Sequence, residues 1–412
     1  MFLTTEEEQS FQGEHGEAIQ LAMSVLVKLG EMYNADRMIQ IEDVHVDASS
    51  YYGISDAGME FVEKMAEMGA AYEVPTTLCI SSIDFGKHAE FDVSEECVEK
   101  QLRIAQAHST MGATPTWTCT PYQCGSSVRF GQNIAWGESN AIAFANSVIG
   151  ARTIRCADFV DICAAITGLM PRFGLYLDDQ RKGSVLFKLE GLDTRQFTSA
   201  DYAALGYYVG GVADSRVPVL HGVSRSVSED QLKAFSAAVS TSGSIGLFHM
   251  TEITPEARSL DEAFGGEKPS EMVVFGRDEL REAKDSLTTQ DGVDPEIAIL
   301  GCPHYSLEEL TETAELLKNK RVSEDKQLWV FTNKCGKKAA EQTGILEKIA
   351  ETGAKVICDT CFLLFPTSAW ELSSIATDSA KMAHYAPGLG DFRVSFLDNV
   401  KCIESVTHDN GG

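Results

Sequence analysis

The sequence predicts an α/β protein with several lobes, in which helices flank mostly parallel sheets. Helical and extended segments alternate along the chain, an order typical of parallel strands joined by crossover helices. The 412 residues are 44% hydrophobic and 23% charged, an ordinary globular composition that supports a large core. We expect one large region over residues 1–405, with lobes at approximately 1–215 and 216–400, and a disordered tail at 406–412.

In the first lobe, apolar periodicity and turn residues define the elements. Ile19, Ala22, Met23 and Leu26 recur at helical spacing, which predicts an amphipathic helix. Ser55 is a favoured type of N-cap for the next helix, which a glycine ends. The predicted elements of this lobe are helices over 19–30, 55–69, 94–112 and 141–149 and strands over 74–80 and 116–120.

The second lobe contains the clearest pattern, a βαβαβ unit near the C-terminus. Ser306 and Glu309 form a Ser-x-x-Glu capping box, which predicts a helix start directly after a strand. We place Cys302 in the strand-to-helix turn, where a helix N-terminus favours a thiolate. The predicted strands are 217–220, 245–249, 272–275, 296–300, 327–331 and 354–358, with helices opening at Ser306 and running over 337–353.

Charge and hydropathy argue against several classes of partner. The chain has 34 Lys and Arg against 61 Asp and Glu, a formal net charge of −27. We expect no nucleic acid and no anionic membrane as a main partner, because phosphate groups need a basic surface. The N-terminal residues lack the apolar region of a signal peptide, and no apolar stretch of about 18 residues predicts a membrane span. We therefore expect a cytoplasmic location.

The eleven cysteines carry the strongest chemical signal in the chain. Cys79, Cys119, Cys302 and Cys361 fall at predicted strand ends, where open α/β sheets bind their ligands. Dispersed thiols that converge there fit an iron–sulfur cluster, whereas the Cys358-x-x-Cys361 pair alone also occurs in redox and zinc sites. Zinc would need a second close pair, which the sequence lacks. Packed, inert thiols are the alternative, and a disulfide framework is not expected in a reducing compartment.

A few polar residues are further candidates for a site. His304 lies two residues from a strand-end cysteine, and His249 lies at a predicted strand end. Asn146 and Ser147 interrupt a helix of small apolar residues, so each must be hydrogen-bonded or face a ligand. Arg152 follows that helix and has the geometry to hold a carboxylate with two hydrogen bonds, or to form a cap or a salt bridge between lobes.

Short motifs in a fixed order resemble the large chain of the aconitase X family. The resemblance extends over essentially the whole chain, and Lys381 fits the same pattern. The motifs are Val74-Pro-Thr-Thr77, Thr118-Cys-Thr-Pro-Tyr122, Gly137-Glu-Ser-Asn-Ala141, Ala145-Asn-Ser-Val-Ile-Gly-Ala-Arg-Thr153, Gly301-Cys-Pro-His304 and Asp359-Thr-Cys361. Each motif is short, but together they are specific, and they outweigh the interpretation of the cysteines as packed thiols.

The resemblance implies an aconitase-like large subunit and a dehydration reaction at an iron–sulfur cluster, [4Fe–4S] or [2Fe–2S]. It implies that Cys119, Cys302 and Cys361 hold the cluster, with Cys124 and Cys358 as bystanders. Family members also carry a small swivelling domain, for which this chain has no room beyond the large region. We therefore expect a separate small subunit, which would also supply the serine that acts as base in aconitases.

Five residues are our candidates for contacts with a small anionic substrate. Lys381 is the candidate partner for an anionic group, and the others come from the N-terminal lobe. The five are Ser50, Asn146, Ser147, Arg152 and Lys381.

The family contains two activities, and the sequence favours one of them. They are dehydration of cis-3-hydroxy-L-proline and dehydration of 5-phosphomevalonate. The archaeal phosphomevalonate pattern has Asn-Pro where this chain has Cys79–Ile80, and a glycine-rich stretch where this chain has 154–163. These differences favour hydroxyproline. Phosphomevalonate dehydration, a non-catalytic iron–sulfur scaffold or regulatory subunit, and a CxxC redox protein are the alternatives.

Overall fold

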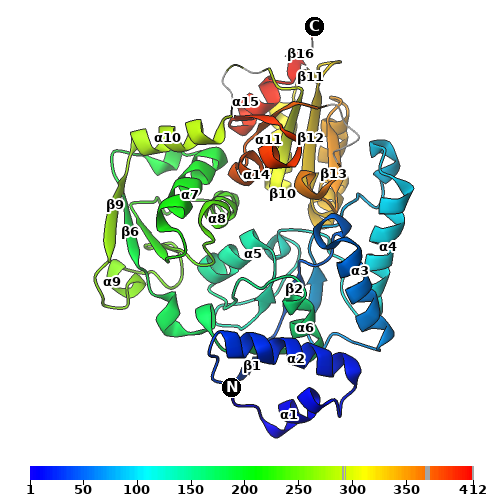
Figure 1. The fold of residues 1–412 in the computed structure, drawn as a ribbon. Coiled ribbons are helices and arrows are strands. Elements are labelled where there is room, and N and C mark those ends of the chain that lie inside the picture. Colours follow the sequence, from blue (N-terminus) through cyan, green and yellow to red (C-terminus); the bar gives the residue numbers. More distant parts are fainter. Residues whose placement is uncertain (290–291, 293, 367–371, 411–412) are drawn as a thin grey trace.

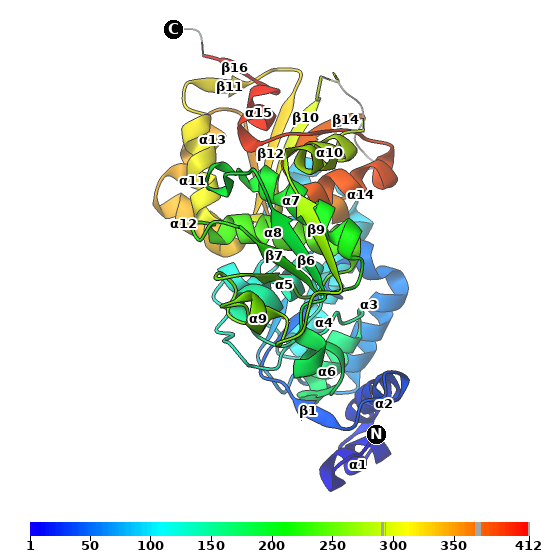
Figure 2. The same cartoon turned by 90° about the vertical axis from the view of Figure 1, so that its left-hand side faces the viewer.

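The computed structural model describes residues 1–412 except 290–291, 293, 367–371 and 411–412. The elements form three groups, each built on its own parallel sheet (Figure 1). Figure 2 shows the N-terminal helices at one end of the molecule and the C-terminal strand at the other. Among the described residues, no helix has the length and apolar composition that crossing a bilayer requires.

The first group contains a three-stranded parallel sheet, ordered β3-β2-β4, and an antiparallel pair of β1 with β5. The buried face of α2 includes Ala22, Met23 and Leu26, as the periodicity predicted. The helices are α1 Thr5–Gln12, α2 Glu17–Met32, α3 Tyr51–Glu67, α4 Glu95–Thr110, α5 Ser139–Phe144 and α6 Val160–Thr167, and the strands are β1 Met38–Gln40, β2 Val44–Val46, β3 Thr76–Leu78, β4 Ala135–Trp136 and β5 Leu169–Pro171.

The second group is a four-stranded parallel sheet, ordered β8-β7-β6-β9, with helices packed on it. Its strands lie on both sides of residue 215, so the division expected there does not coincide with a boundary between sheets. The strands are β6 Val185–Leu189, β7 Pro218–His221, β8 His249–Met250 and β9 Glu271–Phe275, and the helices are α7 Ser199–Ala213, α8 Glu229–Gly243, α9 Leu260–Ala263 and α10 Arg277–Leu287.

The third group is a five-stranded parallel sheet, ordered β13-β12-β10-β14-β15. The parallel pairing of β10, β12 and β13 confirms the predicted βαβαβ unit, and the Ser306–Glu309 capping box opens α11. The five strands are β10 Ile297–Tyr305, β12 Gln327–Thr332, β13 Lys355–Cys358, β14 Ser374–Thr377 and β15 Arg393–Phe396. Strands β11 Lys320–Val322 and β16 Thr407–Asp409 form a separate antiparallel pair, and the helices are α11 Leu307–Leu316, α12 Lys334–Gln342, α13 Ile345–Ala350, α14 Ala380–Gly390 and α15 Asn399–Glu404.

Several predicted elements differ in the structure. The strand predicted over 116–120 is wrong: this segment is irregular, with Trp117 in the left-handed region at φ 48°. The helix predicted over 337–353 is divided into α12 and α13 by Gly344, whose φ of 70° interrupts a helix. Strand β10 continues to Tyr305, so Cys302 lies within an irregular strand end rather than in a strand-to-helix turn.

Two other boundaries move. Helix α3 begins earlier than predicted, at Tyr51, and is broken at Ser55, where φ is 56° and ψ is −169°. The predicted N-cap therefore lies at a kink, and a second helical segment begins after it. At the C-terminus, β16 pairs with β11 in the stretch assigned to a disordered tail, because that pairing satisfies its backbone groups. Residues 411–412 of that tail lie outside the described part of the chain.

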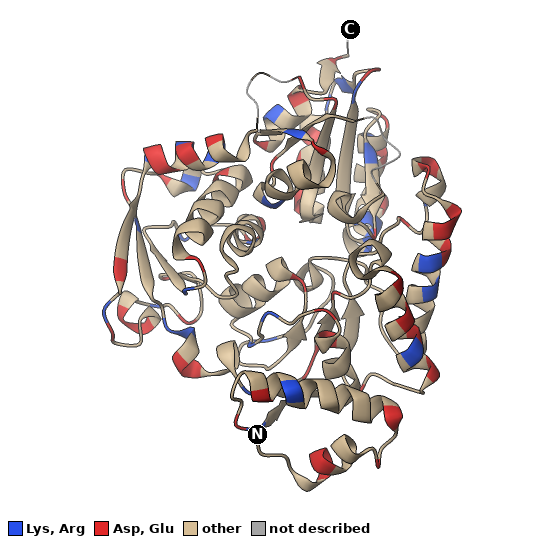
Figure 3. Ribbon diagram, viewed as in Figure 1, with Lys and Arg blue, Asp and Glu red and all other residues tan. Residues whose placement is uncertain are grey.

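The acidic side chains are spread over the outer helices. Figure 3 shows Asp and Glu along α1, α3, α4 and α10, with few charges on the elements that meet at the centre. The centre of the molecule therefore contains only a small number of charged side chains, and these are buried.

Helices α7 and α8 cross at glycines. A Cβ atom on Gly243 would lie 2.0 Å from the carbonyl oxygen of Gly210, whereas a Cβ on Gly211 would have no heavy atom within 4 Å. Glycine at the crossing therefore allows two backbones to touch.

Gly243→Ala should reduce stability by about 3 kcal/mol, because the two helices must separate to relieve a backbone clash. Gly211→Ala, on the same helix pair, should be neutral or stabilising by up to about 1 kcal/mol because alanine favours helix. Thermal unfolding of both variants measures the difference. Equal midpoints for the two variants would contradict the close crossing.

Candidate active site

Three cysteines from distant parts of the chain line one cavity of about 630 Å³, and Cys156 lines it as a fourth. Cys119 lies in the irregular segment 116–120, Cys302 lies in β10, and Cys361 comes soon after β13. Cys79 is buried beside Cys119 and Cys361 but does not line the cavity. The other lining residues used below are Asp47, Glu138, Ser139, Arg155, Asp158 and Lys381.

His304 joins the three cysteine segments. Its backbone N–H donates to Sγ of Cys119 at 3.3 Å, and its Nε2 lies 2.8 Å from the carbonyl oxygen of Thr360. Because that carbonyl can only accept, Nε2 carries the hydrogen, and Nδ1 accepts from the hydroxyl of Thr118 at 3.2 Å. Burial lowers the pKa of His304 to about 4, so the ring is neutral and keeps this tautomer at physiological pH.

A second buried histidine supports the Cys119 segment from the other side. Nε2 of His45 lies 2.9 Å from the carbonyl oxygen of Thr118, and Nδ1 lies 2.8 Å from the hydroxyl of Thr77. The amide of Asn140 donates to the carbonyl oxygen of Cys119 at 3.0 Å. These contacts hold a segment that has no strand or helix hydrogen bonds of its own.

A buried ion pair forms one wall of the cavity. Nζ of Lys381 lies 2.6 Å from Oε1 of Glu138, whose other oxygen accepts from the N–H of Ala141 at the start of α5. Burial raises the pKa of Glu138, but the charge and hydrogen bonds of Lys381 and the helix N–H outweigh it and leave that pKa below its ordinary value. Burial alone would lower the pKa of Lys381, yet Glu138 and Cys302 raise it well above the usual range. The lysine is therefore charged.

The same positive charge acts on the thiols. Burial raises the pKa of Cys302 and Lys381 opposes that rise. Burial raises the pKa of Cys361 to about 12, and Cys302 adds to the rise while Lys381 opposes it. A cation beside buried thiols favours their thiolate forms, which metal ions require.

Arg155, Asp158 and Asp47 form the more open part of the wall. Arg155 and Asp158 are exposed, whereas burial raises the pKa of Asp47 to about 6, with Glu138 and Asp158 adding to the rise. The cavity therefore presents one arginine together with carboxylates.

The structure gives two of the predicted substrate contacts other partners. The hydroxyl of Ser50 lies 2.7 Å from that of Ser82, and the hydroxyl of Ser147 accepts from the N–H of Phe248 at 2.9 Å. Both serines are buried, and neither lines the cysteine cavity. Each hydroxyl therefore has a hydrogen-bond partner within the chain.

Asn146 and Arg152 are also placed elsewhere. Asn146 accepts from the guanidinium of Arg181 at 2.9 Å and donates to two backbone carbonyls. Arg152 donates to the carbonyl oxygen of Tyr176 at 3.1 Å and pairs with Asp178, a salt bridge within the first lobe rather than between lobes. Of the five candidates, Lys381 alone lines the cavity.

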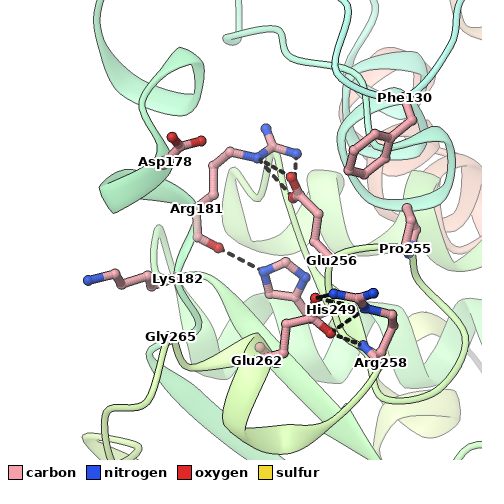
Figure 4. A pocket seen from close by; sticks show the side chains of 11 residues that line it. Phe130, Asp178, Arg181, Lys182, His249, Pro255, Glu256, Arg258, Glu262 and Gly265 are labelled. Carbon is pink, nitrogen blue, oxygen red and sulfur yellow. Dashed lines mark hydrogen bonds and ion pairs between the residues drawn. The ribbon is translucent and has the colours of Figure 1, made fainter.

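Arg181 and His249 belong to a second cavity, of about 480 Å³, shown in Figure 4. Arg181 is buried and pairs with Glu256 at 2.7 Å, and its carbonyl oxygen accepts from Nε2 of His249 at 2.7 Å. Nδ1 of His249 is buried with no hydrogen-bond partner among the described residues. His249 therefore lies outside the cysteine cavity, whereas His304 borders its cysteines.

The donors around the first cavity fit an iron–sulfur cluster. No three His, Cys, Asp or Glu in the described part of the chain are arranged to hold a single metal ion. A cluster is instead held by separate cysteines at its edges, which three thiols around one cavity suit. The buried hydroxyl of Thr360, next to Cys361, lacks a hydrogen-bond partner among the described residues, but Thr360 does not line the cavity.

Sequence reasoning missed several of the lining residues. Glu138 belongs to one of the quoted motifs. Its negative charge, opposite to that of Lys381, was the feature that could have identified it. Asp47 gave no signal, whereas Arg155 and Asp158 belong to the stretch 154–163 that separated the two family patterns but were not singled out within it.

Family models match nearly the whole chain. The Aconitase X first domain matches residues 1–179, the second domain 183–285 and the third domain 295–408. These segments correspond to the three sheet groups of the fold.

Characterised relatives are similar over the same length. The chain is 39% identical to the cis-3-hydroxy-L-proline dehydratase of Pseudomonas aeruginosa, over 96% of this chain and 68% of that protein. It is 36% identical to the phosphomevalonate dehydratase large subunit of Methanocaldococcus jannaschii, over 97% of this chain and 98% of that protein. The crystal structure of aconitase X from Thermococcus kodakaraensis in its holo-form matches with a TM-score of 0.89 and 36% identity, over 98% of this chain and 100% of that chain.

His304→Ala should destabilise the protein by about 2–4 kcal/mol, because the carbonyl of Thr360 and the hydroxyl of Thr118 lose a buried partner. His408→Ala, at an exposed histidine on β16, should change stability by less than about 0.5 kcal/mol. Thermal unfolding of the two variants checks this. A stable His304→Ala protein would show that other contacts hold the cysteine segments.

Proposed function

The chain belongs to the aconitase X family, and from this we propose that it is the large subunit of an iron–sulfur hydro-lyase that dehydrates cis-3-hydroxy-L-proline. Its relatives are named dehydratases, so the chain is an enzyme of the hydro-lyase class rather than a scaffold. The observation that carries the proposal is the single cavity lined by Cys119, Cys302 and Cys361 together with Arg155 and Lys381.

We assign the cluster to the three cavity cysteines. Cys119, Cys302 and Cys361 would each supply one thiolate to a [4Fe–4S] or [2Fe–2S] cluster. When bound, the cluster supplies a Lewis-acidic iron for the leaving hydroxyl. The charge of Lys381 offsets the negative charge that three thiolates bring into a buried place.

The charges of the cavity suit a zwitterion better than a phosphate. Cis-3-hydroxy-L-proline carries one carboxylate and one secondary ammonium group. Arg155 is positioned for the carboxylate, and Asp47 and Asp158 for the ammonium. A phosphate dianion would meet one arginine, a lysine already paired with Glu138, and two further carboxylates. The like charges would oppose its binding.

The residues of this chain then bind and orient the substrate for loss of water. The Cα proton leaves to a base while the C3 hydroxyl departs as water, and the resulting enamine rearranges to Δ1-pyrroline-2-carboxylate. As the proton leaves, negative charge grows on the substrate carboxylate, where Arg155 would stabilise it. The base itself we assign to the partner subunit.

A small swivelling subunit would close the cavity and exclude bulk water. The proposal is supported by the match to proteins named large subunits over 98% of their length, and by the hydroxyproline dehydratase, of which this chain covers 68%. The unmatched third of that longer protein is of a size to hold the same small domain.

Phosphomevalonate dehydration is the second candidate. It is favoured by the end-to-end match to phosphomevalonate dehydratase large subunits, for example 37% identity over 97% of the Methanosarcina mazei protein. Assays of the same protein with each of the two substrates separate the two candidate functions.

The test is anaerobic co-expression of the chain with the small subunit of its own source, followed by assays with both substrates. We expect a brown protein that dehydrates cis-3-hydroxy-L-proline, and Cys302→Ser should lose the visible absorbance and at least about 100-fold in activity because one ligand is removed. Cys358→Ser is the matched control and should keep both. Activity with phosphomevalonate alone would reverse the choice of substrate, and loss of activity in Cys358→Ser alone would indicate a CxxC redox protein.

Arg155→Lys should raise KM for hydroxyproline by about 30-fold, corresponding to about 2 kcal/mol for the lost two-point hydrogen bonding to a carboxylate. Arg152→Lys, three residues earlier and paired with Asp178, should change KM by less than about threefold. Steady-state kinetics of the two variants measure this. A larger effect at Arg152 would show that the substrate binds outside the cysteine cavity.

A further inference from the structure

Two cysteines outside the proposed cluster site meet in the structure. Sγ of Cys124 lies 2.7 Å from Sγ of Cys335, although the two residues are 211 positions apart in the chain. Both are free thiols, Cys335 exposed and Cys124 half-buried. A disulfide bond is about 2.05 Å long, so a small rotation of the side chains would bring the sulfurs to bonding distance.

One of the two thiols comes from the segment that carries Cys119, and the other comes from the third sheet group. Cys124 follows the short 3₁₀ turn Pro121–Gln123, and Cys119 lies two residues before that turn. Cys335 lies in the first turn of α12, from the third sheet group. A bond between them would connect the first group to the third beside the cavity.

Neighbours of Cys335 extend this connection to two cluster-site segments. The amide of Asn333 donates to the hydroxyl of Thr120 at 3.4 Å, next to Cys119. Nζ of Lys334 lies 3.5 Å from a carboxylate oxygen of Asp359, two residues before Cys361. The start of α12 therefore already contacts both segments, and a covalent bond would fix it there.

We propose that Cys124 and Cys335 form a reversible disulfide, with a low-molecular-weight disulfide such as glutathione disulfide as the oxidant. The exposed Cys335 thiolate attacks one sulfur of glutathione disulfide and releases one glutathione thiolate. The Cys124 thiolate then attacks the Cys335 sulfur of the mixed disulfide and releases the second glutathione. Two protein thiols are oxidised, one glutathione disulfide is reduced, and the two protons pass to the released glutathiones.

The order of attack follows from the surroundings of the two thiols. Cys335 is exposed in the first turn of α12, where glutathione disulfide can reach its sulfur, so Cys335 reacts first. Burial and the hydrogen bond to Cys335 raise the pKa of Cys124 to about 12, so Cys124 is the slower, resolving thiol. The CxxC pair differs, because both its cysteines are buried and Cys358 donates to the carboxylate of Asp359 at 3.5 Å.

The experiment treats the anaerobically purified full chain with glutathione disulfide, blocks free thiols with N-ethylmaleimide, and maps the peptides by mass spectrometry. We expect a peptide pair linked through Cys124 and Cys335, reversed by dithiothreitol, and a thermal midpoint raised by about 5 °C because the bond closes a long loop. Cys335→Ser and Cys124→Ser should abolish both. Cys156→Ser, a partly exposed cysteine of the same chain, should retain the linked pair.

Three results would overturn the proposal. They are glutathione retained on Cys335 while Cys124 stays free, linkage of either residue to a different cysteine, and both thiols blocked by N-ethylmaleimide after treatment. Because the readouts are peptide masses and thermal midpoints, the result does not depend on the substrate or on activity.

Discussion

The geometry of the cavity depends on one buried side chain, the imidazole of His304. A fully buried histidine must find partners for both ring nitrogens, and those partners belong to the Thr118 and Thr360 segments. Its backbone N–H contacts the sulfur of Cys119 as well. Through one residue, the segments of all three cavity cysteines are held at fixed separations.

A buried charge network fixes the position of His304 in turn. Nζ of Lys233, on α8 of the second sheet group, donates to the carbonyl oxygen of His304 at 3.1 Å and to Asp230 at 2.8 Å, and it also pairs with Glu309 of α11. Burial would lower the pKa of Lys233, but the two carboxylates raise it. Burying such a network costs desolvation energy, so we do not assign it a large contribution to stability. Its role is to specify one arrangement of the second sheet group against the third. A second buried pair, Lys381–Glu138, performs the same task at the cavity wall between the third and first groups.

The cysteines show that closeness in the sequence does not determine which side chains meet in the structure. The adjacent CxxC pattern suggests a redox pair, but the thiols that touch are Cys124 and Cys335, from different sheet groups. Likewise Arg152 and Arg155 lie three residues apart, and the arginine that lines the cavity is the one outside the family motif. Gly150, with φ of 78°, turns the chain directly before them, and the path after that turn decides which arginine faces inward.

The sequence by itself determined the parallel α/β class, the βαβαβ unit, the capping box that opens α11 and the cysteines worth testing. These features depend on alternation, caps and strand ends, which are local properties of the chain. Tertiary structure alone decided which thiols share a cavity, that Asn146 accepts a hydrogen bond from Arg181, and that Arg155 lines the cysteine cavity. The physical reason is that burial and hydrogen-bond partners arise where three separately folded sheets meet, and no short stretch of sequence contains that junction.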